Sequence, residues 1–225
     1  MGNQETTVTR RILLSLLSLS LVAAAAVLGV LGPAGAASTV RYDRTWSPPL
    51  DLSSNFRPCC PSTAKFKVLP FSMNVKGSQQ AQLTVRFKTN WVDSKAISYT
   101  PNIIQQGRYV MPIEFKIQIG KGHHAADHRA QCRVAGSTGV VIALGPKIDI
   151  ANGQWHTVEC IKYADGSSST AVVVVVDGVS GARAHSPTRI GNVISSQPVD
   201  LGGQGPTANG DSLDGRVSLV KYVVS

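Results

Sequence analysis

The chain has 225 residues and a formal net charge of +9, with 22 lysines and arginines against 13 aspartates and glutamates. This length fits a short leader and one domain, and the excess of positive charge favours acidic partners such as cell-wall polymers or anionic polysaccharide. Lysine and arginine nevertheless form no dense block, only 6% of the residues are aromatic, and no basic stripe has helical spacing. We therefore expect no nucleic-acid-binding module.

Residues 1–36 are predicted to be a secretory signal peptide. Arg10 and Arg11 precede an apolar run over 12–31, and small residues at 34–36 form a cleavage pattern. A membrane anchor is the alternative, because the run is long enough to span a bilayer, but the small-residue exit favours cleavage. Export by the general route and by the twin-arginine route both stay open. We expect a secreted, extracellular protein with no stable membrane span after cleavage.

Residues 37–77 are rich in proline and are predicted to form an extended arm packed on the domain that follows. Pro48, Pro49, Pro58 and Pro61 interrupt regular structure in this arm. A short strand over 65–69 fits its alternation of side chains.

From residue 78 onward the pattern is that of a β-sandwich. Apolar and polar residues alternate with the period of two that places one face of a strand inward, and Gly, Pro, Asn and Asp separate the segments. No long segment has apolar residues at helical spacing. The predicted strands lie around residues 82–88, 102–108, 113–119, 131–134, 139–144, 155–162 and 172–176. The fold class is therefore all-β, an antiparallel β-sandwich over 78–225.

The clearest prediction is a hairpin over residues 155–179. In its first strand His156 shares one face with Val158 and Cys160, opposite Trp155. A polar turn follows over 164–170, and the next strand contains five consecutive valines, as in a strand covered on both faces. Asp177 and Gly178 then supply the pair favoured where a turn needs positive φ.

Four short motifs in this region carry a resemblance to a known family. They are Trp-His-Thr-Val at 155–158, Val-Asp-Gly at 176–178, Leu-Gly-Gly at 201–203, and a closing strand over 213–222 entered through a glycine. Together they resemble the laminin G-like branch of the concanavalin A-like jelly rolls, over about Gln82–Ser225. The resemblance implies a jelly roll that binds its ligands through loops at the rim of the sandwich.

The four cysteines predict disulfides, because the chain is expected to be exported. Of the three pairings we favour Cys132 with Cys160, since both lie in predicted strands and the bridge would close a loop of about 28 residues. Exported bacterial laminin G-like domains are similar in having a cysteine before and one within this strand. The vicinal Cys59 and Cys60 stay open: they could bond to each other, pair with separate partners or remain reduced. Their spacing argues against a zinc site.

Two groups of residues are candidate metal ligands. His123, His124 and His128 lie in one polar loop with an aspartate, which is a ligand set for transition metals, although a solvated loop explains the same residues. The family resemblance implies calcium at the sandwich rim, where Asp211 and Asp214 are candidates, and turn chemistry explains these equally well. We expect no other cofactor.

Exposed aromatic side chains are candidate sugar platforms. Trp91 and Tyr109 are the main candidates for binding, with Trp46 and Tyr99 behind them, whereas we expect Trp155 in the core.

Catalytic patterns are weak. After the leader only Glu114 and Glu159 are glutamates, and neither lies in the context of a retaining glucanase. The sequence differs from the Gln-Ile-His pattern of alginate lyases, because Gly120 and not a histidine follows Gln118-Ile119. His123 and Tyr222 could nevertheless lie near a lyase site. The leading prediction is a non-catalytic recognition module for extracellular glycan or protein. The alternatives are a polysaccharide-active lyase or glycosidase, and a structural wall or adhesion protein held to anionic polymer by its basic surface.

Overall fold

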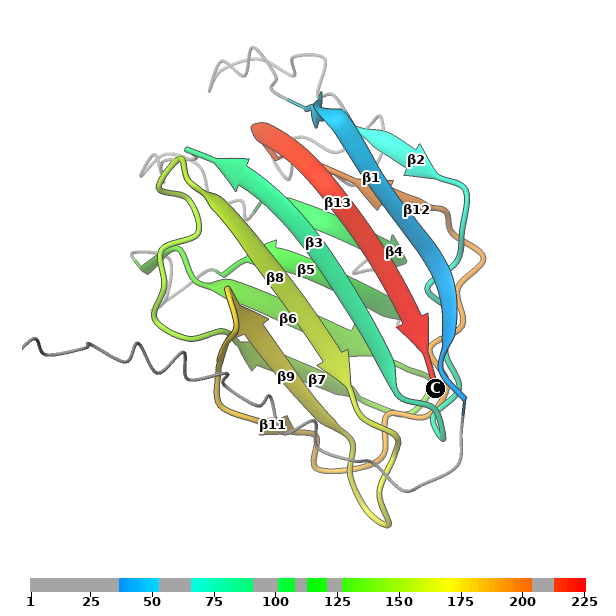
Figure 1. Cartoon of the computed structure of the whole chain (residues 1–225). Coiled ribbons are helices and arrows are strands. Elements are labelled where there is room, and N and C mark those ends of the chain that lie inside the picture. Colours follow the sequence, from blue (N-terminus) through cyan, green and yellow to red (C-terminus); the bar gives the residue numbers. More distant parts are fainter. Residues whose placement is uncertain (1–36, 53–65, 91–100, 108–112, 121–126, 204–212) are drawn as a thin grey trace, which may run out of the picture. The chain divides into compact units, whose positions relative to one another are not determined.

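The protein folds as a sandwich of two antiparallel β-sheets, as the alternation of its side chains predicts (Figure 1). The computed structural model describes residues 37–52, 66–90, 101–107, 113–120, 127–203 and 213–225, all of which belong to the unit Ala36–Ser225. The predicted fold class is therefore confirmed. Among these residues no helix is long and apolar enough to cross a membrane.

One sheet has seven strands, and its first and last strands in sequence lie side by side. Their order is β1-β13-β3-β8-β9-β10, and β11 also pairs with β9. In Figure 1 the C-terminal strand, in red, lies between the blue N-terminal strand and β3. The bounds are β1 Thr39–Asp51, β3 Ala81–Thr89, β8 Trp155–Lys162, β9 Ala171–Val176, β10 Val179–Ser180, β11 Ala184–His185 and β13 Gly215–Val224.

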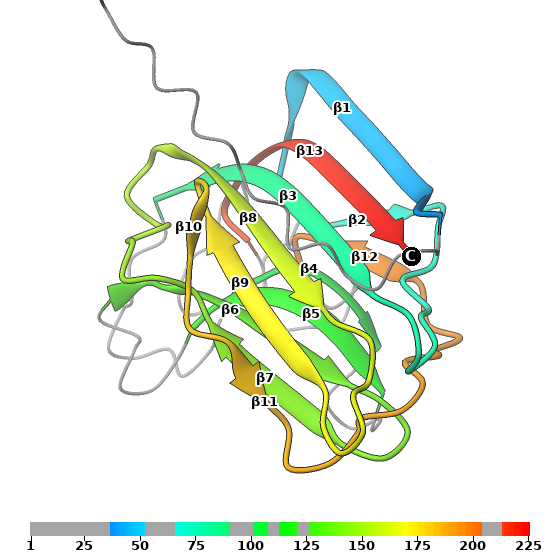
Figure 2. The same cartoon turned by 60° about the horizontal axis from the view of Figure 1, so that its bottom comes forward.

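The other sheet has six strands in the order β2-β12-β4-β5-β6-β7. Figure 2 shows it as a second layer, stacked on the first. The bounds are β2 Lys67–Leu69, β4 Asn102–Gly107, β5 Glu114–Ile119, β6 Ala130–Ala135, β7 Val140–Leu144 and β12 Val199–Leu201.

The core lies between the two sheets. Alternate residues of each central strand point into it and are fully buried, such as Leu83, Val85 and Phe87 of β3 and Phe115 and Ile117 of β5. This is the inward face that the sequence pattern predicted, and burying it supplies most of the driving force for folding.

A disulfide bridge joins the two sheets through this core and confirms the predicted pairing. Cys132 of β6 and Cys160 of β8 are bonded, with their Cα atoms 5.9 Å apart and both side chains fully buried. The bridge therefore connects strands of opposite layers.

Residues 39–51 lie within the predicted extended arm and form a strand, with irregularities between Val40 and Tyr42 and between Thr45 and Leu50. Strand β1 pairs with β13 from Thr39 opposite Val224 to Asp51 opposite Arg216. Pro48 and Pro49 fit within it because β1 is the edge of its sheet, where one side of the strand needs no hydrogen-bond donors. The predicted short strand at 65–69 is found as β2. The boundary of the domain at residue 78 stays a prediction.

The predicted hairpin is present, and two of the family-like motifs in it contact each other. Strand β8 pairs with β9, and Asp177 and Gly178 have φ angles of 50° and 81° in the turn to β10. The Asp177 carboxylate accepts from the Thr157 backbone N–H at 2.7 Å and contacts Nδ1 of His156 at 2.7 Å. His156 thus connects the Trp-His-Thr-Val strand to the Val-Asp-Gly turn and has a structural role.

Candidate functional site

Most of the binding residues expected from the sequence lie outside the described residues. These are Trp91, Tyr99, Tyr109, His123, His124 and Asp211. Cys59 and Cys60, whose pairing the sequence leaves open, also lie outside them. Their roles stay predictions.

The described members of the two candidate metal groups have other local partners. His128 places Nδ1 3.2 Å from Oδ1 of Asp149, and the backbone carbonyl of Asp214 accepts a hydrogen bond from the Thr89 hydroxyl. Within the described ranges no three His, Cys, Asp or Glu side chains gather into a metal-binding group.

Two aromatic residues lie where the sequence analysis did not expect them. Tyr222 is fully buried, and its hydroxyl donates to the backbone carbonyl of Met73 at 2.8 Å, so it is a core residue and does not line a surface site. Burial also raises the pKa of this phenol well above its usual range. Trp155 was expected in the core, yet it is half-buried on the outer face of the seven-stranded sheet, opposite the core-facing His156. Trp46 is half-buried against the core.

The two glutamates of the expected mature chain lie on different sheets. Glu114 is on β5 of the six-stranded sheet, and Glu159 is on β8 of the seven-stranded sheet, where its carboxylate accepts from the Gln82 amide. Because both point away from the core between the sheets, they cannot flank one glycosidic bond.

The outer face of the six-stranded sheet carries the densest group of polar side chains. We call this group the polar floor. Its members alternate with core residues along four adjacent strands, β12, β4, β5 and β6, so they all point to the same side of the sheet. They are Asn102, Gln105, Glu114, Lys116, Gln118, Gln131, Arg133 and Asp200.

The register of the strands arranges the polar floor in rows. In the central row Asp200 lies opposite Gln105, Gln105 opposite Lys116, and Lys116 opposite Arg133. A neighbouring row places Asn102 opposite Gln118, and Gln118 opposite Gln131. Directly opposed side chains on adjacent strands have Cβ atoms about 5 Å apart, so each row forms a continuous track of polar groups.

Charge on the polar floor is paired. Glu114 is fully buried, and its carboxylate lies 3.2 Å from Nζ of Lys116 and forms an ion pair with Arg133. Asp200 lies in the central row with Lys116 and Arg133. Together with Glu114, the polar floor therefore holds two acidic and two basic side chains. The polar floor therefore has no net charge.

In the part of the chain that the structure describes, Oε1 of Gln105 accepts no hydrogen bond, and Oε1 of Glu114 accepts none but lies beside the Lys116 ammonium. Gln105 is only 1% exposed and its amide nitrogen donates to the Gly107 carbonyl at 3.2 Å, but its Oε1 receives no hydrogen bond there. A buried polar atom without a partner costs about 1 to 3 kcal/mol. Such an atom suits a site whose ligand supplies the missing donor.

Apolar side chains border the polar floor at both ends of its central row. Val68 of β2 lies opposite Asp200, and Ile142 of β7 lies opposite Arg133. These side chains are 52% and 49% exposed, and Val140 on the same face of β7 is 42% exposed. The outer face of this sheet thus has a polar centre that is largely buried and apolar edges that are exposed.

Part of this site could be predicted from local alternation. The alternation of Glu114, Lys116 and Gln118 with Phe115, Ile117 and Ile119 predicted that one face of this strand points inward. In the structure the polar face is also largely buried, because Lys116 is 7% exposed and Gln118 9%. The contribution of Gln105 and Asp200 could not be found from local alternation, because it depends on strands far apart in sequence lying side by side.

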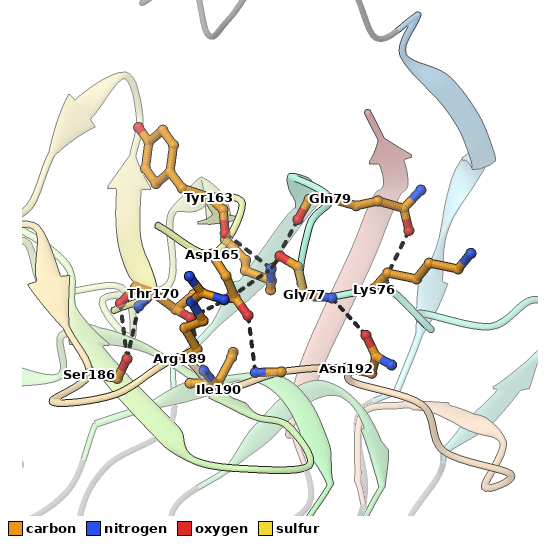
Figure 3. A network of polar contacts seen from close by, with 12 residues as sticks. Lys76, Gly77, Gln79, Tyr163, Asp165, Thr170, Ser186, Arg189, Ile190 and Asn192 are labelled. Atoms are coloured by element: carbon orange, nitrogen blue, oxygen red, sulfur yellow. Dashed lines mark hydrogen bonds and ion pairs between the residues drawn. The ribbon is translucent and has the colours of Figure 1, made fainter. Parts of the chain in front are cut away.

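A second polar cluster, shown in Figure 3, is structural. The fully buried Lys162 donates to the backbone carbonyls of Gly77 at 3.0 Å, Gln79 at 2.9 Å and Tyr163 at 3.1 Å, and its Nζ lies 3.7 Å from Asp165. Burial lowers the pKa of this ammonium, and Asp165 opposes that shift.

Asp165 extends this cluster to other parts of the chain. It accepts from the Thr170 hydroxyl and from the Gly191 backbone N–H, while Asn192 accepts from the Gly77 backbone N–H at 2.9 Å (Figure 3). These polar groups form hydrogen bonds with one another and connect the segments around Gly77, Asp165 and Gly191. We therefore assign the cluster a structural role.

Comparisons with known proteins identify the fold. A scan against protein-family models and a search of curated proteins found no match. Among solved structures, the chain is similar to the binding domain of a paraclostridial mosquitocidal protein, with a TM-score of 0.53, 6% identity, and coverage of 81% of this chain and 44% of that one. It is also similar to CBM40 of an IT-sialidase from Ruminococcus gnavus, with a TM-score of 0.51, 10% identity, and coverage of 80% and 90%.

Domains LG4-5 of the mouse laminin α1 chain match with a TM-score of 0.47 and 21% identity, over 72% of this chain and 40% of that one. The chain thus spans less than half of the laminin and toxin chains that it matches. At these identities the likeness shows the fold alone, which is a concanavalin A-like, laminin G-like jelly roll. Polysaccharide lyases and a glucanase also match, with TM-scores of 0.43 or less. A fold does not by itself decide function.

Proposed function

We propose that this jelly-roll domain is a non-catalytic recognition module that binds an extracellular glycan across the polar floor. The observation that carries the proposal is the row of Asp200, Gln105, Lys116 and Arg133 over four adjacent strands, with a buried acceptor on Gln105 that lacks a donor among the described residues. A rigid sheet holds these groups at fixed spacing, which favours recognition of a repeating ligand.

A glycan suits the chemistry of the polar floor better than a protein does. Sugar hydroxyls both donate and accept hydrogen bonds, so they match amide and carboxylate groups alternating with ammonium and guanidinium groups. Protein interfaces instead place apolar and aromatic residues at their buried centre, whereas here the apolar residues Val68 and Ile142 lie at the edges. The fold likeness to CBM40 supports a carbohydrate ligand.

The disulfide favours a location outside the cell, where an extracellular glycan would be met. The Cys132–Cys160 disulfide is stable in oxidising compartments, and disulfides are rare in reducing ones. The signal peptide predicted over residues 1–36 would deliver the domain there.

The first experiment is a glycan-array screen of the purified chain from residue 37 onward, with calcium and with chelator, followed by titration of each hit. The decisive variant is Gln105→Met, which replaces the partnerless acceptor by an apolar side chain of similar length. We expect at least a tenfold loss of affinity with the free energy of unfolding unchanged within about 1 kcal/mol, because an unsatisfied group is removed together with one hydrogen bond.

A matched control is Gln82→Met, on the outer face of the other sheet, which should leave the affinity unchanged. Wild-type affinity in Gln105→Met would refute the proposed site, and a large loss of stability would show that Gln105 is a structural residue.

Catalysis is tested in the same experiment. An ultraviolet assay for unsaturated sugar ends on every hit detects a lyase. We expect none, because Tyr222, the proposed lyase residue that the structure describes, has its hydroxyl committed to the Met73 carbonyl inside the core.

A further inference from the structure

Three cations stand close together on the outer face of the seven-stranded sheet, on the side of the protein opposite the polar floor. Arg86 and Lys88 alternate along β3, and Arg216 of β13 lies directly opposite Lys88. On the other side of Lys88 lies Trp155 of β8. We call Arg86, Lys88, Arg216 and Trp155 the cationic cluster.

The indole ring of Trp155 organises this cluster. The guanidinium carbon of Arg86 lies 5.0 Å from the ring centroid, and Nζ of Lys88 lies 5.6 Å from it. Two cations therefore contact one indole ring through cation–π interactions, which hold flexible side chains near one another. This explains why Trp155 remains on the surface although its size favours burial.

Among the residues that the structure describes, none of the three cations of the cluster is within ion-pair distance of a carboxylate, although Asp51 lies across from Arg216 and Glu159 shares this sheet face. Lys88 and Arg216 are like charges directly opposite each other, and such pairs repel. An anion bound between them would offset this repulsion.

A pocket of about 300 Å³ opens beside the cluster, at the end of β3. Lys88 and Arg216 line it together with Asn90, and Asp214 contributes the one carboxylate of the described lining. Two cationic residues and an asparagine therefore line a space large enough for a carboxylate or sulfate group and part of a sugar ring.

We propose that the cationic cluster and this pocket form a second binding site, which takes an anionic glycan. The ligand class follows from the geometry: the cations lie on a grid of about 5 Å between strands and about 7 Å along β3, so the site engages several oxyanions of a repeating polymer at once. Carboxylated and sulfated sugars share this chemistry. The site does not depend on the polar floor, which faces the other way and carries no net charge.

The test compares three hexasaccharides by calorimetric titration of the chain from residue 37 onward. The probes are a heparin hexasaccharide, hexagalacturonate and neutral cellohexaose, each at several NaCl concentrations. We expect binding of one or both charged probes, which also distinguishes sulfate from carboxylate, and affinity that falls as salt rises, because the contacts are ionic. Equal affinity for cellohexaose would overturn the proposal.

The decisive variant is Arg86→Gln with Lys88→Gln and Arg216→Gln. It should weaken the charged probes at least tenfold and flatten their salt dependence, while thermal stability stays equal or rises because like charges are gone. Removal of structural contacts alone would lower stability. The matched control is Arg44→Gln with Arg183→Gln and Lys221→Gln, which removes the same charge elsewhere and should keep most of the affinity.

Two outcomes would overturn the proposal in specific ways. Equal losses in the cluster variant and the control would mean that overall charge, and no defined site, binds the probes. Tighter binding of a single-stranded DNA hexamer than of either charged glycan would overturn the ligand class. Gln105→Met should leave these affinities unchanged, so failure here and failure of the polar floor are distinguishable.

Discussion

At the scale of single residues, the structure assigns structural roles to two buried polar side chains. Tyr222 and Lys162 are both fully buried, and each is satisfied by backbone carbonyls. Buried polar groups are tolerated when they are hydrogen-bonded and costly when they are not. Their contribution is therefore to stability.

We predict that Tyr222→Phe lowers the free energy of unfolding at pH 8 by about 1 kcal/mol, because the hydrogen bond to Met73 is lost. Burial raises the pKa of Tyr222 above its ordinary value of 10.0, so the unfolded chain loses this proton first. The contribution of the phenol to the free energy of unfolding is therefore fully present below pH 10 and decreases as the pH rises above 10. The Tyr222→Phe variant should not show this decrease. Urea unfolding between pH 8 and pH 11 measures both effects, with Tyr163→Phe as control. A variant with the same alkaline loss as the wild type would contradict the assignment.

Lys162→Met should be far more damaging, by about 3 to 5 kcal/mol, because Asp165 and three carbonyls lose the cation that they surround. The control is Lys221→Met, whose ammonium lies 3.6 Å from Asp43 in a pair that is nearly half exposed, and which should change stability by less than about 1 kcal/mol. Chemical denaturation of both variants checks this. Similar small effects would show that the buried ammonium is dispensable.

At the scale of elements, the hairpin of β8 and β9 shows what the sequence reveals and what it hides. Alternation predicted that His156, Val158 and Cys160 share one face of β8, and the Asp177-Gly178 pair predicted the turn. Neither pattern predicted the contact between His156 and Asp177, because this contact depends on the pairing of the two strands. The same limit explains the error at Trp155, where aromatic character suggested the core although the register of His156 placed it outside.

Asp177→Ala should destabilise the domain by about 2 kcal/mol, because Asp177 holds a positive φ, accepts from Thr157 and contacts His156. Asp177→Asn also tolerates the positive φ and keeps an acceptor, so it should lose less than half as much. Thermal unfolding of the two variants gives the comparison. Equal losses would mean that the charge on Asp177, and not the turn, dominates.

At the scale of the whole molecule, strand existence was predictable and sheet order was not. Period-two alternation located the central strands and the inward faces of β3 and β5, because burial on one side leaves a local record in the sequence. The place of β13 between β1 and β3, and of β12 beside β4, joins segments far apart in the chain. The polar floor depends on that order, as does the cationic cluster, so neither could be assembled from local patterns.

The disulfide acts at the same scale, because it ties one sheet to the other. Replacing Cys132 and Cys160 together by alanine should lower the free energy of unfolding by about 2 to 4 kcal/mol, since the unfolded chain loses a crosslink across 28 residues. Urea titrations of the oxidised protein and the variant measure this. Identical midpoints would contradict a stabilising role.

The location of glycan binding can be observed directly. We would record the amide spectrum of ¹⁵N-labelled protein during titration with the tightest uncharged hit from the array. The account predicts that the side-chain amides of Gln105, Gln118 and Gln131 shift together, along with the backbone of β4, β5 and β6, while β3 and β8 stay unchanged. Shifts confined to the seven-stranded sheet, with the three floor glutamines unmoved, would contradict the polar floor as the binding site.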